Sequence, residues 1–187
     1  LCIKGKYMFI GGLMAQVANK LQHLEEIEGH PIKIRPVTLD DAEIERDFIE
    51  DLSTLSKHYR FLGGVAHLTP EELVDLCDMD YENKMAFVAV IQDKGKEKQI
   101  GVSRYAMNQY GDSYEFSVAV ADEWQNKGLG TLLMKYLVDY AREQGVTRLY
   151  SIDFADNYKM KSLAKDLGMH VETDPNDSKQ VIYSLYI

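Results

Sequence analysis

Residues 125–131 read Gln-Asn-Lys-Gly-Leu-Gly-Thr, between an apolar run at 116–120 (FSVAV) and an amphipathic stretch from Leu132 to about Gln144. This order predicts a strand, a glycine-rich loop and a helix. The free N–H groups and the dipole at the start of a helix favour a phosphate ligand. The loop lacks the lysine and hydroxyl that follow the last glycine of a P-loop, and it lacks the third glycine of a dinucleotide fingerprint. The remaining pattern, Q-x-x-G-x-G, predicts an anion site of another kind.

The composition indicates a single globular domain and bears on the kind of partner that it meets. A chain of 187 residues with 45% hydrophobic residues is long enough to bury a core. The net charge of −9 argues against nucleic acid or an anionic membrane surface as the main partner. An acidic protein is better suited to a cationic substrate, such as an amine or a lysine-bearing surface.

The cysteines and the first residues bear on the compartment. Cys2 and Cys77 form no disulfide framework, and the five histidines show no metal-binding spacing, so we expect no metal site. The segment 1–14 is apolar and carries Lys4 and Lys6, as a signal peptide would. Gly11 and Gly12 interrupt it, and no small-residue cleavage site follows. We therefore expect a cytoplasmic protein without a membrane span.

Residues 13–28 are predicted to form an amphipathic helix that Gly29-His30-Pro31 ends. We assign residues 1–30 to an N-terminal extension and 31–187 to one domain. The apolar stripe of the helix is narrow, so it would pack either on the domain edge or on a second copy in a homodimer. Its members are Met14, Val17, Leu21 and Leu24.

The rest of the chain predicts an α/β fold. Three strands at 85–91, 99–107 and 114–120 follow one another through short turns, as in an antiparallel meander. The strand at 148–153 follows the helix that begins near 129, so this strand–helix–strand unit predicts one right-handed parallel crossover. The result is a mixed, mostly antiparallel sheet with helices on both faces. Further elements are predicted at 32–35, from 38, from 69, at 157–167 and at 181–187.

Together these segments closely resemble the GNAT superfamily of acetyl-CoA-dependent N-acetyltransferases over about residues 32–187. The resemblance rests on the meander that ends in V-A-V, on Q-x-x-G-x-G-T, and on N-x-x-x-x-x-L-A-x-x-L-G-M from residue 157. The segments 56–61 (SKHYRF), 68–73 (LTPEEL), 80–89 (DYENKMAFVA) and 114–120 (YEFSVAV) are most similar to Pat-type bacterial protein lysine acetyltransferases. Substrates vary widely on one fold.

The resemblance implies an acetyl-CoA site along the third meander strand and the loop. Loop amides would bind the CoA pyrophosphate, and the strand edge would pair with the pantetheine arm. The N–H of Val118 is the candidate that polarises the acetyl carbonyl. A simple strand-to-helix turn is the alternative interpretation. The implied CoA contacts are Val118, Ala119, Val120, Gln125, Asn126, Lys127, Gly128, Leu129, Gly130, Thr131 and Asn157.

Glu115 is the candidate general base. An amine arrives as ammonium and must lose a proton before it attacks a thioester, and a partly buried carboxylate near the centre of a strand can accept that proton. A glutamate occupies the same place in Pat-type domains. The alternative is a strand glutamate that faces solvent or pairs with a lysine.

Two more positions carry implications from the family. Asn157 matches the asparagine that opens the second helix and contacts pantetheine, although it would also serve as a plain N-cap. Many GNAT enzymes place a tyrosine general acid seven residues later, where this chain has Ala164. We therefore expect no tyrosine acid there, as in Pat-type domains.

Tyr59 and Arg60 lie in the less regular segment 53–68 and are candidate contacts for the acceptor. The alternative is an aromatic–basic pair that packs at the surface. Cys77 falls on an apolar helical stripe and is expected to be a core residue rather than a nucleophile.

The predicted activity is direct transfer of acetyl from acetyl-CoA to an amine, with a protein lysine as the favoured acceptor. An acyl-CoA synthetase is the first protein substrate to test. Acetylation of a small-molecule amine and a non-catalytic, acetyl-CoA-binding regulatory role are the alternatives.

Overall fold

The computed structural model describes residues 20–64, 67–111 and 113–187, which form one eight-stranded sheet with helices on both faces. The strand order is β1-β2-β3-β4-β5-β6-β8-β7. The strands are β1 (His23–Ile27), β2 (His30–Pro36), β3 (Lys84–Asp93), β4 (Lys96–Met107), β5 (Tyr114–Val120), β6 (Arg148–Phe154), β7 (His170–Thr173) and β8 (Gln180–Tyr186). The helices are α2 (Ala42–Asp51), α3 (Thr54–Arg60), α4 (Pro70–Cys77), α5 (Leu129–Glu143) and α6 (Tyr158–Asp166), with short 3₁₀ turns η1 (Leu39–Asp41) and η2 (Asp122–Trp124).

All neighbouring strands run antiparallel except β5 and β6, which form the parallel pair made by the β5–α5–β6 crossover. The predicted mixed α/β fold, with its one parallel crossover, is confirmed. β7 was not predicted from the sequence. All of its residues are exposed, so they lack the apolar alternation that marks a half-buried strand.

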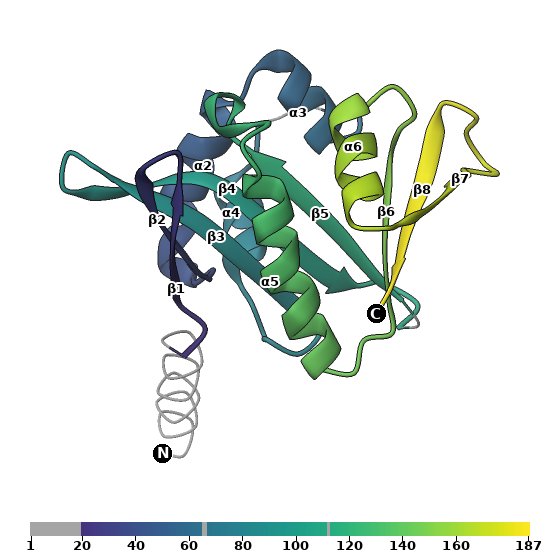
Figure 1. Cartoon of the computed structure of the whole chain (residues 1–187), viewed down its shortest axis with the longest axis horizontal. Helices are drawn as coiled ribbons and strands as arrows, with labels where there is room; N and C mark the ends of the chain where they lie inside the picture. Colours follow the sequence, from purple (N-terminus) through teal and green to yellow (C-terminus); the bar gives the residue numbers. More distant parts are fainter. Residues whose placement is uncertain (1–19, 65–66, 112) are drawn as a thin grey trace.

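The prediction of a helix over residues 13–28 is wrong for His23–Ile27, which form β1 (Figure 1). Glu28 and Gly29 both have positive φ, at 53° and 81°, and make the two-residue turn that joins β1 to β2. Gly29 therefore turns a hairpin rather than ending a helix. Leu24, expected on a buried stripe, is 78% exposed.

The inward face of β1 explains why a strand is stable at this edge. His23 stacks on Tyr136 of α5 at 4.2 Å between ring centroids, and the Tyr136 hydroxyl donates to Glu25. These contacts recur at every second residue, which is the period of a strand. Residues 1–19, which hold most of the predicted helix and its stripe residues Met14 and Val17, lie outside the described part of the chain. The division of the chain at residue 30 stays a prediction.

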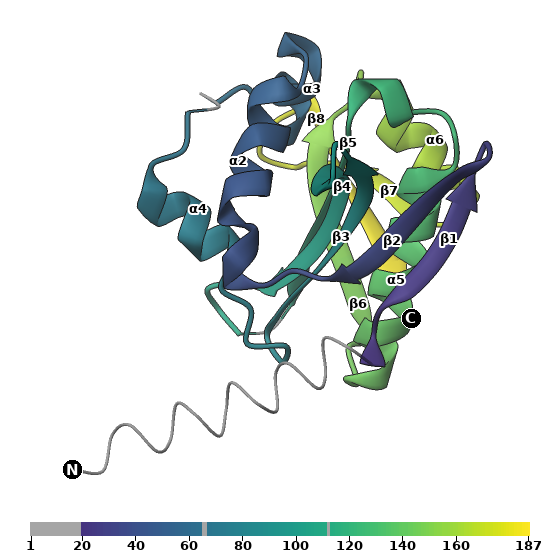
Figure 2. The ribbon, with the colours of Figure 1, turned by 90° about the vertical axis from the view of Figure 1, so that its left-hand side faces the viewer.

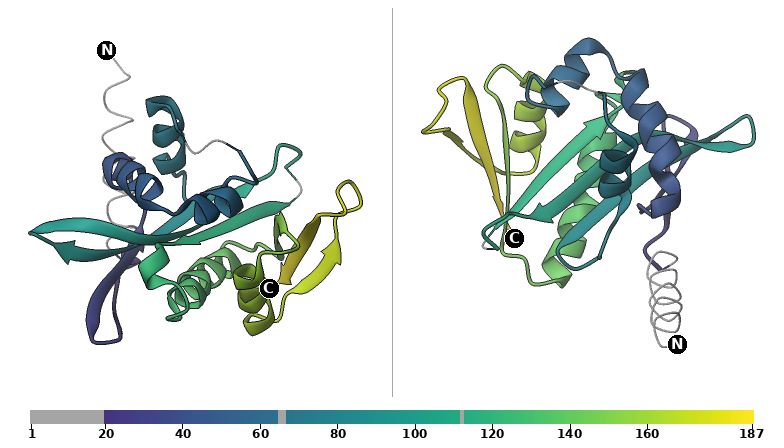
Figure 3. Two further views of the ribbon diagram at one scale, coloured as in Figure 1. Left: turned by 90° about the horizontal axis from the view of Figure 1, so that it is seen from above. Right: turned by 180° about the vertical axis from the view of Figure 1, so that it is seen from behind.

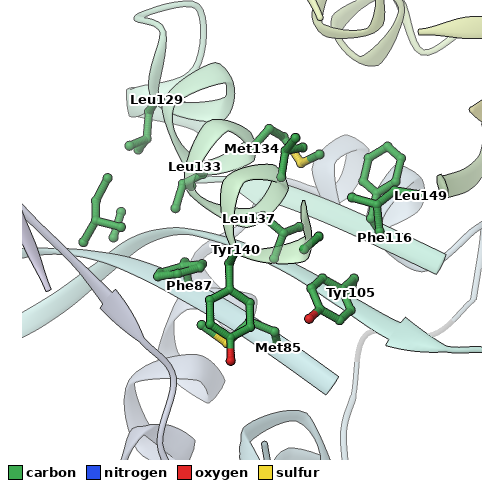
Figure 4. Packing of buried hydrophobic residues seen from close by; sticks show 14 of the residues in the cluster. Met85, Phe87, Tyr105, Phe116, Leu129, Leu133, Met134, Leu137, Tyr140 and Leu149 are labelled. Carbon is green, nitrogen blue, oxygen red and sulfur yellow. The ribbon is translucent and has the colours of Figure 1, made fainter. Parts of the chain in front are cut away.

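The sheet separates two hydrophobic clusters. α5 and α6 cover one face, and α2 and α4 cover the other (Figures 2 and 3). α5 presents Leu129, Leu133 and Leu137, all fully buried, toward the strands, where Figure 4 shows them among the aromatic side chains of the sheet. Each such leucine contributes about 2 kcal/mol by burial. No helix in the described ranges is long and apolar enough to cross a bilayer.

The parallel pairing of β5 with β6 is short, and this feature opens the sheet. Only Tyr114 and Glu115 of β5 pair with β6, opposite Leu149 and Tyr150. β5 continues along β4 as far as Val120, while β6 turns away toward β8. Figure 1 shows the two strands adjacent at one end and diverging toward the other.

Candidate active site

A cavity of about 640 Å³ lies where β5 and β6 diverge. α3, α6 and the beginning of α5 lie around it (Figure 1). Most positions predicted from the sequence to form the site line this cavity, although they come from segments far apart in the chain. They are Tyr59, Arg60, Glu115, Val118, Ala119, Val120, Gln125, Asn126, Gly128, Gly130, Thr131 and Asn157.

One edge of β5 faces the cavity. The N–H of Ala121 donates to the carbonyl of Ile100 on the β4 side, at 2.9 Å. Backbone groups alternate along a strand, so Val118 and Val120 direct their N–H and C=O toward the opposite edge. β6 no longer pairs with β5 at these residues. The Val120 carbonyl accepts a hydrogen bond from the Gln125 side chain at 2.9 Å. The edge at Val118 has no strand beside it.

The first turn of α5 offers a set of free donors to the same cavity. The first bond of the helix runs from the Leu132 N–H to the Gly128 carbonyl at 3.0 Å. The N–H groups of Leu129, Gly130 and Thr131 therefore have no acceptor within the helix. Gly128 precedes the helix with φ of 86°, a conformation that glycine adopts without strain. This geometry suits an anion.

Gln125 braces the loop rather than presenting its side chain to a ligand. Its amide nitrogen donates to Val120 and, at 3.2 Å, to the Ser56 hydroxyl of α3, while its oxygen accepts from Lys159 of α6. Gln125 therefore lines the cavity. Its side chain, however, is engaged by protein groups on three sides.

The side chains of two predicted loop residues point away from the cavity. Lys127 pairs with Glu28 at 2.8 Å and lies over the Trp124 ring at 5.6 Å. Leu129 is fully buried in the core. Neither residue lines the cavity, so each is limited to a contribution from its main chain.

Glu115 is the last residue of β5 that pairs with β6, so it lies at the point where the strands separate. It is the second residue of the strand, not near its centre as expected. Its side chain is exposed to the cavity, yet the surrounding protein removes enough water to raise the pKa of the carboxyl above its ordinary value. No lysine or arginine of the described chain lies within 4.0 Å of it, so the predicted alternative of a lysine pair is not found.

Asn157 caps α6 and is tied to a carboxylate that was not singled out from the sequence. Its side-chain oxygen accepts from the Met160 N–H at 3.2 Å, and its nitrogen donates to Asp153 at 2.8 Å. Asp153 ends the buried part of β6 and also accepts from the Phe154 N–H at 2.7 Å. Burial raises the pKa of the Asp153 carboxyl to about 6. A single Asp at a strand end carries no sequence pattern that marks it.

Asp153 is expected to lower the stability of the protein as the pH rises from about 4 to about 7. The pKa of its carboxyl is about 6 in the folded chain and 3.8 in a free side chain. The folded state therefore keeps a proton that the unfolded state has lost, and the free energy of unfolding falls by roughly 2 to 3 kcal/mol across this window. Asp153→Asn removes this contribution. Urea unfolding of both proteins at pH 4.5 and 7 measures it, and a difference between them that does not change with pH would contradict the assignment.

α3 forms a wall across the opening and carries the predicted acceptor contacts. Asp122, another residue not found from the sequence, accepts from the Ser53 N–H and from the hydroxyls of Ser53 and Ser56, at 2.7 to 2.8 Å. At its other end, His58 stacks on Phe154 of β6 at 4.6 Å between ring centroids. α3 therefore bridges the two sides of the opening and holds Tyr59 and Arg60 at the cavity.

Ala164 and Cys77, for which no catalytic role is predicted, do not line the cavity. Ala164 is fully buried in α6 and has no group to protonate a leaving thiolate. Cys77 is buried, and burial raises the pKa of its thiol to about 12, which leaves too little thiolate for a nucleophile at neutral pH. No cluster of three or more His, Cys, Asp or Glu residues that could hold a metal ion occurs among the residues the structure describes.

The comparisons with known proteins agree with this geometry. The sequence model of the Acetyltransferase (GNAT) family matches residues 49–169. The chain is 41% identical over 158 residues to Acetyltransferase PA5475 of Pseudomonas aeruginosa, covering 84% of this chain and 85% of that protein. It is 25% identical over 144 residues to spermidine N(1)-acetyltransferase of Escherichia coli, covering 76% and 75%.

A solved structure shares the fold. The GNAT domain of S. lividans PAT superposes with a TM-score of 0.80 at 24% identity, over 90% of this chain and 98% of that one. The family model covers more than half of the chain, and the Pseudomonas relative matches it along most of its length. The chain therefore belongs to the GNAT family of acetyltransferases.

Proposed function

We propose that this protein transfers the acetyl group of acetyl-CoA to a primary amine, with a lysine side chain of a protein as the preferred acceptor. One observation carries the proposal: the parallel pairing of β5 and β6 ends at Glu115. That ending places a carboxylate, an unpaired strand edge and the donors of α5 around one cavity.

The residues present fit acetyl-CoA. The N–H groups at the start of α5 and the glycines beside them suit a pyrophosphate, since no side chain of Gly128 or Gly130 blocks the approach of the backbone. The free edge of β5 at Val118 suits the amide groups of the pantetheine arm. The thioester supplies an acetyl carbonyl that is open to attack by an amine.

Proton removal, oxyanion stabilisation and orientation of the donor then each have a residue. Glu115 takes the proton from the ammonium group of the acceptor, directly or through water, and its raised pKa brings the carboxyl closer to the operating pH. The N–H of Val118 donates to the acetyl oxygen as negative charge develops there. Asn157, held by Asp153, orients the donor from the α6 side. No protein acid is assigned to the thiolate, which leaves without one.

The preference for a protein lysine draws on similarity. The similarity of segments such as 114–120 to Pat-type domains supports it, and so does the acidic character of the chain, which favours cationic acceptors. An acyl-CoA synthetase is the first protein to test. The spermidine acetyltransferase of Escherichia coli supports the alternative of a small-molecule amine.

An acceptor screen tests the proposal. Release of CoA thiol from acetyl-CoA is followed with protein lysines, lysine derivatives, polyamines and amino acids. We expect release above the slow reaction with water for at least one class of amine. A protein that binds acetyl-CoA but releases no thiol with any amine would instead be a non-catalytic regulatory module.

A further inference from the structure

Arg60 is a half-buried cation that lines the cavity without a carboxylate partner. It is the last residue of α3, and its guanidinium lies over the Phe61 ring at 5.3 Å from the centroid. That contact is a cation–π contact, and the ring is not a carboxylate that could match the charge. Within the described ranges, no Asp or Glu oxygen lies within 4.0 Å of it.

The surroundings of Arg60 make this unpaired charge costly. Burial and the neighbouring guanidinium of Arg104 lower the pKa of Arg60 to about 10. Glu45 is the nearby carboxylate, and both of its oxygens are already occupied: one accepts from Arg104 and the other from Gln99, each at 2.6 Å. A desolvated cation beside a second cation destabilises the protein unless an anion offsets it.

Another half-buried arginine, Arg35, shows the usual arrangement. Arg35 donates to Asp41 and to Glu97 at 2.6 to 2.8 Å, so its charge is matched within the protein. Arg60 differs because its unused donors lie at the wall of a cavity. A ligand is therefore the group that can match its charge.

Arg60 also lies on the same side of the sheet as the proposed base. Glu115 and Ser117 project from β5 on the face where Ala119 packs against the cluster of α2 and α4. The neighbour of Arg60, Arg104, reaches Glu45 of α2 on that same face. CoA approaches from α5 and α6 on the opposite face, so Arg60 belongs to the acceptor side of the cavity.

We infer that Arg60 binds a carboxylate of the acceptor, so that the preferred amines, protein lysines included, are those with a carboxylate close to the reacting amine. This inference rests on the proposed acetyl transfer and narrows its acceptor. Glu115 receives the ammonium end, and Arg60 receives the carboxylate by a charge-assisted hydrogen bond. A polyamine such as spermidine has no such group and is repelled by the unmatched charge of Arg60.

A matched pair of acceptors tests the inference. Nα-acetyl-L-lysine and Nα-acetyl-L-lysinamide carry the same amine and differ only in the carboxylate. For the wild-type protein we expect kcat/KM for the acid to exceed that for the amide about tenfold, which is the size of one charge-assisted hydrogen bond. In Arg60→Gln the ratio should fall to within about twofold, and Arg60→Lys should retain part of it.

Arg46→Gln is the control, since Arg46 is an exposed arginine of α2 outside the cavity and should leave the ratio unchanged. Calorimetry of both lysine compounds with CoA in place of acetyl-CoA gives a second readout that requires no turnover. Equal wild-type values for acid and amide in both assays, or a preference that survives in Arg60→Gln, would overturn the inference. Failure of every amine to react, with the acid still bound more tightly than the amide, would overturn the proposed acetyl transfer alone.

Discussion

Glu115→Gln is expected to lower kcat for acetyl transfer about 100-fold at pH 7 while acetyl-CoA still binds. Glutamine keeps the size of the side chain but accepts no proton, and a positioned general base contributes roughly 100-fold or more. The loss should shrink as the pH approaches about 10, where the free amine of lysine becomes abundant without a base. Stopped assays of CoA release across this pH range, with calorimetry of acetyl-CoA binding, measure both effects.

Glu172→Gln serves as the matched control, because Glu172 is an exposed glutamate of β7 that does not line the cavity. It should react at the wild-type rate. Near wild-type transfer by Glu115→Gln at pH 7 would remove Glu115 as the base. A loss that stays constant at high pH would assign it a purely structural role.

Gly130→Val is expected to weaken acetyl-CoA binding about 100-fold. The first carbon of a side chain at this position meets only Val120, at 3.7 Å, which is an ordinary van der Waals contact. A branched side chain would instead occupy the space above the free N–H groups of α5 and displace one or two charge-assisted hydrogen bonds to phosphate. Isothermal calorimetry with acetyl-CoA gives the affinity, and thermal unfolding verifies the fold.

Gly130→Ala adds a single methyl group at the same position and should lose less affinity than Gly130→Val. Gly128 is less suited to this test, because its φ of 86° would strain any other residue and confound stability with binding. Unchanged acetyl-CoA affinity in a folded Gly130→Val protein would show that the pyrophosphate binds elsewhere.

Much of the fold follows from periodicity and turn chemistry in the sequence. α4 begins next to the predicted position 69, after a capping box of Thr69 and Glu72, and the meander occupies the expected segments. β1 was mistaken for a helix because part of its stability comes from Tyr136, which is more than 100 residues away in sequence, in addition to its pairing with β2. The contact with Tyr136 is too distant in sequence to leave a local pattern. β7 is an exposed edge strand that pairs with β8, so its residues show no apolar alternation.

The site was predictable where backbone geometry is tied to residue type. Gly128 has a positive φ, and it lines the cavity together with Asn126, Gly130 and Thr131. The polar partners that hold the site together were not predictable. Asp122 accepts hydrogen bonds from the start of α3, and Asp153 accepts one from Asn157. Neither aspartate belongs to a recognisable sequence pattern. Only the folded chain brings these carboxylates to their donors.

Acetyl transfer at this cavity is tested most directly by mass spectrometry of Nα-acetyl-L-lysine after incubation with the protein and acetyl-CoA. We expect one acetyl group to be added to the side-chain amine, in proportion to the CoA thiol released, and about 100-fold less product with Glu115→Gln at pH 7. A wild-type protein that binds acetyl-CoA in calorimetry but leaves this amine and every other amine of the screen unmodified would contradict the proposed function.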